Sequence, residues 1–309
     1  MAFAILAALL LAPATAVHAE PSRAEIQQRI NRDSTILEGI VEQYNKVNEE
    51  LKQTKAAAAR HAASLPSLQA QLATAEADIS HIAVTAYKTG GLRTIEAVLG
   101  GERSGPFLDR IGTLDQLARE RRTQIAGFTE ANQRYAVEKR KLDTALAKQN
   151  IQLRDLAARK VTIEADLKKL YELRRQAYGQ ATTPGSRYTG KIPSISGRAG
   201  VAVRFAYSVI GAPYVWAGEG PGYDCSGLTL SAWRAAGKSL PHNAAMQWDV
   251  VAHIGRGAIM PGDLIFYRGL GHVALYVGGG KVIHSPTFGR SVTLADMDMS
   301  TPYGYGRVR

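Results

Sequence analysis

Hydrophobic residues recur along the first half of the chain at alternating intervals of four and three residues. Between Ile26 and Ala86 this pattern covers 18 positions without a slip, and 12 of them are large and apolar while three are alanine. A period of 3.5 residues kept over this length is typical of a coiled-coil helix. Pro66 lies inside the run, where a proline removes a helix hydrogen bond, so we expect a kink or a break there.

A second run of the same kind begins at Phe107 and continues to Leu170 with more polar members. Several glycines between residues 90 and 106 separate the two runs. Two long helices joined by a compact connection fold back on each other, so residues 20–178 are predicted to form an antiparallel coiled-coil hairpin. The heptad pattern does not distinguish between three roles for this hairpin: a passive spacer, a docking arm for a partner, and a lid over an active site.

The helical period stops at Tyr178, and the next segment has a different composition. Residues 179–197 contain four glycines, two prolines and six serines or threonines. Such a composition favours a flexible tether, which would let the two halves of the chain move independently.

Residues 198–309 follow a third pattern, in which helical spacing gives way to short apolar strands. One helix is predicted over 198–210, and another begins at Cys225 after the glycine-rich turn 218–222. Three strands are predicted at 263–267, 272–277 and 281–284, and the glycine turn before Lys281 joins the last two as an antiparallel hairpin. Helices followed by a small antiparallel sheet indicate an α+β domain.

The first residues indicate export. An apolar run from Ala2 to Ala12 precedes Pro13 and a small-residue site ending at Ala19, so residues 1–19 are predicted to be a signal peptide, although no basic residue precedes the run. The run is too short to span a bilayer. A net charge of +11 suits an anionic wall or membrane surface. We find no nucleic-acid-binding motif and expect a secreted protein associated with the cell wall.

Cys225 is the only cysteine among the 309 residues, which excludes a disulfide framework. It falls in the first turn of a predicted helix, where unpaired N–H groups and the helix dipole favour the nucleophilic thiolate. A buried, inert cysteine is the alternative interpretation. Two observations favour a catalytic role for Cys225 over the inert interpretation: the chain is predicted to be exported with a single thiol, and two histidines are placed at strand ends.

The two histidines are His272, at the start of one predicted strand, and His284, at the end of the next. Antiparallel pairing brings these ends to the same edge of the sheet. If the Cys225 helix packs on this sheet, the three side chains meet as nucleophile, general base and orienting group. Two histidines and one cysteine lack the carboxylate or the spacing of a metal site, so no metal or cofactor is expected.

Several short motifs in residues 198–309 carry a resemblance to the NlpC-type cell-wall peptidases, a papain-like cysteine peptidase family. They are Pro213-Tyr214-Val215-Trp216, Asp224-Cys225-Ser226-Gly227-Leu228, Leu240-Pro241, Pro261-Gly262-Asp263-Leu264, residues 271–278 and Val282-Ile283-His284. The resemblance implies hydrolysis of a peptidoglycan stem peptide, typically between D-glutamate and a diamino acid. It also implies that Cys225, His272 and His284 are catalytic.

By the same resemblance, Tyr214 helps to form the oxyanion site, and Asp224 and Ser226 line the substrate cleft. Many relatives carry arginine after Leu240-Pro241, whereas this chain has His242 and Asn243. This departure puts the substrate contact from that loop in doubt.

A helical hairpin ahead of such a domain resembles division hydrolases that dock on a membrane complex of the FtsEX type, which would make the hairpin regulatory. Two other functions stay open. One is an amidase that cuts the sugar–peptide bond, and the other is a non-catalytic wall-binding or activator protein.

Overall fold

The computed structural model describes residues 22–89 and 107–309. The predicted signal peptide and the glycine-rich connection between the two heptad runs lie outside these residues. Contacts divide the chain into two compact units. Among the described residues, the first consists of residues 22–41, Ile163–Leu240 and Gln247–Arg309, and the second of residues 42–89 and 107–162 together with Pro241–Met246.

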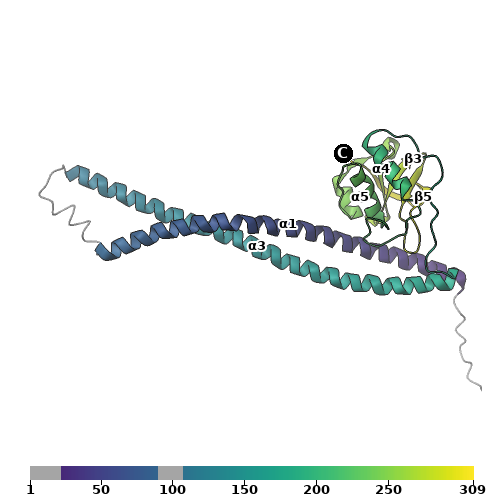
Figure 1. Cartoon of the computed structure of the whole chain (residues 1–309), viewed down its shortest axis with the longest axis horizontal. Coiled ribbons are helices and arrows are strands. Elements are labelled where there is room, and N and C mark those ends of the chain that lie inside the picture. Colours follow the sequence, from purple (N-terminus) through teal and green to yellow (C-terminus); the bar gives the residue numbers. More distant parts are fainter. Residues whose placement is uncertain (1–21, 90–106) are drawn as a thin grey trace, which may run out of the picture. The chain divides into compact units, whose positions relative to one another are not determined.

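Two long helices, α1 (Arg23–Thr89) and α3 (Phe107–Tyr178), account for the heptad runs (Figure 1). Helix α1 starts with a capping box, in which the Glu25 N–H donates to Ser22 Oγ and the Ser22 N–H donates to Glu25 Oε2. In the second unit, Arg159 donates to Gln43 at 2.8 Å and Glu138 contacts His61 at 2.6 Å. Residue numbers therefore rise along α1 as they fall along α3, which makes the pair antiparallel.

Helix α1 continues through Pro66 without a break. The proline lacks the N–H that would donate to the carbonyl of Ala62, and both Ala62 and Pro66 are exposed residues of α1. The predicted alternative of a split at this point is therefore wrong.

The C-terminal region carries a six-stranded antiparallel sheet in the order β1-β6-β2-β3-β4-β5. The strands are β1 (Ala252–Ile254), β2 (Leu264–Tyr267), β3 (His272–Gly278), β4 (Lys281–His284), β5 (Thr293–Asp296) and β6 (Pro302–Arg307). The three predicted strands correspond to β2, β3 and β4 and are confirmed. Strands β1, β5 and β6 were not predicted.

Strand β6 was not predicted because two of its positions, 304 and 306, are glycines without side chains. A Cβ on Gly304 would lie 2.5 Å from the Trp248 ring, and one on Gly306 would lie 2.3 Å from Val251. These neighbours fill the space that strand side chains usually occupy, so the apolar alternation expected of a strand is missing.

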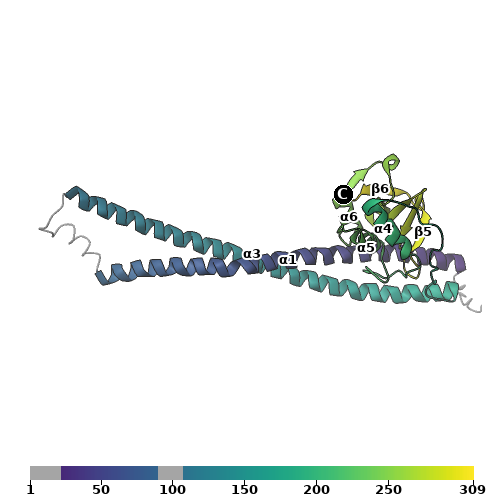
Figure 2. The same cartoon turned by 45° about the horizontal axis from the view of Figure 1, so that its top comes forward.

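Three shorter α-helices complete the α+β domain: α4 (Gly197–Ser208), α5 (Cys225–Ala235) and α6 (Ala244–Val250). Two short 3₁₀ helices, η1 (Arg256–Ala258) and η2 (Arg268–Leu270), flank β2. Helices α4 and α5 pack on each other and both contact β3 (Figures 1 and 2). A separate apolar cluster of the sheet contains Ile265, Tyr267, Ala274, Tyr276, Val282 and Met297. The sheet is thus buried around β2 and β3, and the predicted fold class, long helices followed by a small α+β domain, is confirmed.

The segment between α3 and α4 contains no helix or strand but is held in place inside the first unit. Arg174 donates to the carbonyls of Ala181 and Gly289, at 2.7 and 3.0 Å. The Thr183 N–H also donates to the Gly289 carbonyl. Within the described residues, no helix combines the length and the hydropathy needed to cross a bilayer.

Candidate active site

Helix α5 begins at Cys225, and its start is fixed by the residue before it. The Asp224 carboxylate accepts a hydrogen bond from the Gly227 N–H at 2.7 Å, and the Asp224 carbonyl accepts one from Leu228. The Asp224 N–H in turn donates to the carbonyl of Gly218 in the preceding turn. The buried thiol therefore lies in the first turn of a capped helix, as the sequence predicts.

His272 and His284 meet at one edge of the sheet. His272 is the first residue of β3 and His284 is the last of β4, and these strands are antiparallel neighbours. Nε2 of His272 lies 2.9 Å from Nδ1 of His284, and the two rings are perpendicular. The predicted juxtaposition of the two imidazoles is confirmed.

The sheet edge that carries His272 and His284 also contacts the start of α5. Helix α5 packs against β3 and β4. The hydroxyl of Ser285, which follows His284, donates to the carbonyl of Tyr223, two residues before Cys225, at 2.7 Å. Among the described residues, Nδ1 of His272 has no hydrogen-bond partner. His284 thus holds one nitrogen of His272 and leaves the other available for proton transfer.

Burial keeps both imidazoles neutral. Desolvation lowers the pKa of His272 well below its usual value of 6.5, and the neighbouring His284 and Arg268 lower it further. Desolvation, followed by the charges of Arg290 and Arg268, lowers the pKa of His284 to about 3. A neutral imidazole can accept a proton from a thiol, so the pair is in the form that a general base requires.

Residues 211–305 match the sequence model of the NlpC/P60 family. This region is an NlpC/P60 domain. A probable endopeptidase of Mycobacterium tuberculosis is 26% identical over an alignment of 359 positions, which covers 97% of this chain and 92% of that protein. The γ-D-glutamyl-L-lysine dipeptidyl-peptidase of Bacillus subtilis is 43% identical over 96 residues, 28% of this chain and 31% of that protein.

Among solved structures, the NlpC/P60 domain of the peptidoglycan hydrolase SagA is 33% identical, with a TM-score of 0.34. The match covers 36% of this chain and 98% of that one. The chain described here carries, after its long helical region, a domain whose relatives include proteins named as endopeptidases, one of them a peptidoglycan endopeptidase of Mycobacterium tuberculosis.

The remaining predicted site residues of the NlpC/P60 domain are buried. The Tyr214 ring packs against the Phe288 ring in a tilted arrangement, with the ring centroids 4.5 Å apart. Ser226 places its carbonyl where Thr229 and Gln247 both donate to it. The substrate-binding role of Tyr214, Asp224 and Ser226 stays a prediction, while the structure gives the Asp224 carboxylate a definite role in capping the helix.

Replacing Asp224 by alanine is expected to destabilise the NlpC/P60 domain by about 1 kcal/mol, because the Gly227 N–H loses its acceptor. Asp224→Asn keeps an acceptor oxygen and should retain most of the stability. Urea unfolding followed by tryptophan fluorescence measures the difference, since all three tryptophans lie between residues 216 and 248. Equal midpoints for the alanine and asparagine variants would contradict the capping role.

Asn243, in the loop whose substrate contact the sequence leaves in doubt, has a structural role in the second unit. Its Oδ1 accepts from the Met246 N–H at 2.9 Å, which caps α6, and its Nδ2 donates to the Glu42 carboxylate. Glu42 also accepts from the Ala244 N–H at 2.6 Å. An asparagine directly before a short helical stretch is the sequence signal that indicates such a cap.

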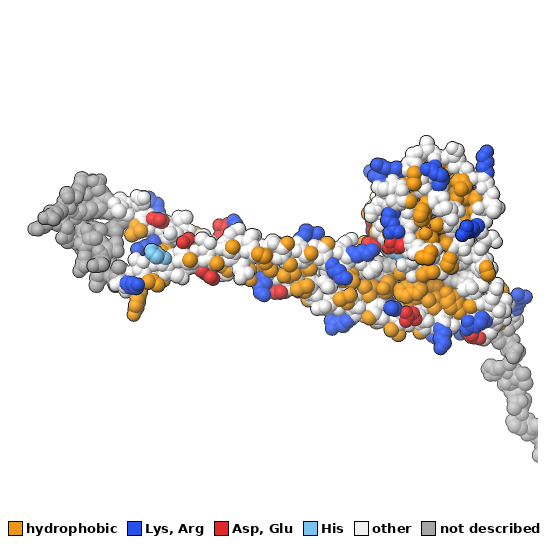
Figure 3. Space-filling model, viewed as in Figure 1, with side chains coloured by type: hydrophobic (Ala, Val, Ile, Leu, Met, Phe, Trp, Pro, Cys, Tyr) orange, Lys and Arg blue, Asp and Glu red, His pale blue; other side chains and the backbone are white. Residues whose placement is uncertain are grey.

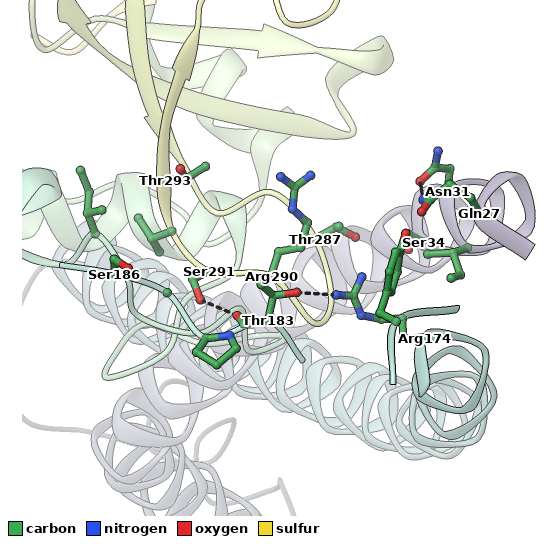
Figure 4. A pocket seen from close by; sticks show the side chains of 16 residues that line it. Gln27, Asn31, Ser34, Arg174, Thr183, Ser186, Thr287, Arg290, Ser291 and Thr293 are labelled. Atoms are coloured by element: carbon green, nitrogen blue, oxygen red, sulfur yellow. Dashed lines mark hydrogen bonds between the residues drawn. The ribbon is translucent and has the colours of Figure 1, made fainter. Parts of the chain in front are cut away.

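A cavity of about 540 Å³ opens beside the two histidines within the first unit. Besides His272 and His284 it is lined by Glu38 of α1 and by Arg268, which follows β2. A neighbouring cavity of about 620 Å³ shares Ser34 and Arg290 with it. Figure 4 shows the second cavity, where residues of α1, the end of α3 and the loop after β4 converge. Sequence reasoning missed the α1 residues, because polar positions outside the heptad seam are usually solvated.

Proposed function

We propose that this chain is a secreted cysteine endopeptidase of peptidoglycan that cleaves the stem peptide between D-glutamate and the following diamino acid. One observation carries the proposal: His284 contacts Nε2 of His272, while Nδ1 of His272 is buried without a hydrogen-bond partner among the described residues, at the sheet edge that Ser285 joins to the start of the Cys225 helix. The name of the peptidoglycan endopeptidase of Mycobacterium tuberculosis supports the substrate class, and that of the Bacillus subtilis enzyme supports the γ-D-glutamyl bond.

In this mechanism His272 carries its proton on Nε2, which donates to Nδ1 of His284, so that Nδ1 of His272 takes the thiol proton. The Cys225 sulfur then forms a bond to the scissile carbonyl carbon. The oxyanion is held by the Cys225 backbone N–H with help from Tyr214. His272 returns the proton to the leaving amine as the C–N bond breaks. Water, deprotonated by His272, then hydrolyses the thioester and regenerates the thiol.

We further propose that the helical hairpin docks on a membrane division complex of the FtsEX type. Large apolar side chains are exposed near the described ends of α1 and α3, including Tyr87 with 90% of its surface accessible, Val84 and Ile111. Figure 3 shows further hydrophobic side chains along both helices. Exposed apolar side chains of this kind favour a protein partner.

The test is digestion of purified peptidoglycan by the intact chain, with mass analysis of the products. An endopeptidase of the proposed specificity leaves a new amino terminus on the diamino acid and a D-glutamate at the new carboxyl end. Release of the whole stem peptide from the sugar would instead establish the amidase. Binding to peptidoglycan without any soluble product would establish a non-catalytic wall-binding protein.

A further inference from the structure

Helix α1 buries polar side chains on a face that lies outside its heptad seam. In the first unit, Ser34 and Glu38 are only 4% and 3% exposed, and they lie one helical turn apart. The apolar seam residues nearby, Ile30 and Leu37, are buried as well. Burying an incompletely satisfied carboxylate is costly, so a helix that needed only structural support would be expected to place an apolar residue there.

The partner of Glu38 belongs to the site. Arg268 Nη1 donates to Glu38 Oε2 at 2.5 Å, while Glu38 Oε1 has no hydrogen-bond partner among the described residues. Arg268 lies four residues before His272, and its charge acts on both imidazoles. Glu38 and Arg268 line the same cavity as the two histidines. A carboxylate and a guanidinium thus occupy the space beside the proposed reaction centre.

The backbone that carries Arg268 adopts an unfavourable conformation. Arg268 and Leu270 have φ angles of 52° and 71°, and Gly269 between them has 61°. Two non-glycine residues in the left-handed region within three positions are uncommon, and each costs free energy that the surrounding structure must supply. Such strain is characteristic of segments that position a side chain for binding or catalysis.

We infer that Arg268 binds a carboxylate of the substrate, and that Glu38 occupies the place of that carboxylate in the form of the chain described here. The inference rests on the proposed function. A D-glutamate joined through its γ-carboxyl keeps its α-carboxylate, which lies a short aliphatic chain away from the scissile carbonyl. Arginine suits a carboxylate because its planar fork of N–H donors matches the two oxygens.

This assignment makes Arg268 a specificity-determining residue and Glu38 an internal competitor. Stem peptides with the carboxylate are expected to bind better than peptides whose α-carboxylate is amidated. Removal of the Glu38 charge should improve binding of the carboxylate form only, because the amide gains nothing from a vacated Arg268.

The experiment uses the intact chain with Cys225→Ala, which prevents turnover, and isothermal calorimetry at about pH 8.5, where Glu38, whose pKa burial raises to about 7, is ionised. The probes are L-Ala–γ-D-Glu–L-Lys and the same peptide with an α-amide. Adding Glu38→Gln is expected to tighten binding of the carboxylate peptide about tenfold. Adding Arg268→Gln should weaken binding of that peptide about tenfold or more and leave the amide unchanged, which removes the preference.

Arg256→Gln serves as the matched control, because Arg256 is an exposed arginine paired with Asp298 at 2.7 Å. It should bind both peptides as the Cys225→Ala parent does, and tryptophan fluorescence verifies the fold of each variant. Equal affinity for the two peptides in the Glu38→Gln variant would overturn the assignment of Arg268 while leaving the endopeptidase in place. Binding of neither peptide by any variant, with no cleavage by the unmodified chain, would overturn the proposed function itself.

Discussion

Cys225→Ala is expected to abolish cleavage of peptidoglycan stem peptides by the intact chain, with a loss of about four orders of magnitude or more in rate. The reason is chemical rather than structural. The sulfur forms the covalent intermediate, and no other cysteine exists in the chain to replace it. Release of new amino termini from purified peptidoglycan, followed over hours, measures the loss.

The matched control for this substitution is Cys225→Ser, which keeps a hydroxyl of similar size in the first turn of α5. It should also lose nearly all activity, because an alcohol beside a neutral imidazole is a far weaker nucleophile than a thiolate. Both variants should unfold at urea concentrations close to that of the unmodified chain. If the activity of Cys225→Ala were within tenfold of that of the unmodified chain, the assignment of Cys225 as the nucleophile would be refuted.

Lowering the pH from 7.5 to 4 is expected to reduce the contribution of His284 to the free energy of unfolding by about 3 kcal/mol. Burial lowers the pKa of His284 to about 3, against 6.5 in the unfolded chain. Below pH 6.5 the imidazole of His284 is therefore protonated in the unfolded chain but stays neutral in the folded chain. The free energy of unfolding consequently falls as the pH falls. The loss levels off only near pH 3.

The measurement is the free energy of unfolding of the unmodified chain minus that of His284→Gln, from urea titrations at each pH. The difference is needed because burial raises the pKa of Glu38 to about 7, with Arg268 opposing the shift. Glu38 therefore adds stability as the pH falls below 7, which opposes the effect of His284. A difference that stays constant from pH 7.5 to pH 4 would show that His284 is protonated in the folded chain.

The sequence predicted those parts of the site that depend on local pattern. The position of Cys225 in a first turn follows from the glycine-rich turn and the helical spacing after it. The meeting of His272 and His284 follows from two adjacent strands joined by a tight turn, since antiparallel pairing fixes which ends coincide. Both predictions use contacts between residues that are close in the chain or joined by a short turn.

What the sequence could not predict depends on contacts between distant segments. The pair of Glu38 and Arg268 joins residues 230 positions apart, and nothing in either segment indicates the other. A glutamate outside a heptad seam is usually solvated, so its burial becomes visible only when the surrounding segments are placed. The unpredicted strands β1 and β5 are short, at three and four residues, which leaves too few positions for a pattern to show.

Strand β6 lies among the last residues of the chain, where sequence changes are ordinarily tolerated. Its two glycines differ from such positions because the indole of Trp248 and a methyl group of Val251 already fill the volume beside them. In a saturation mutagenesis scan, positions 304 and 306 would therefore group with the hydrophobic interior, and even alanine would be selected against.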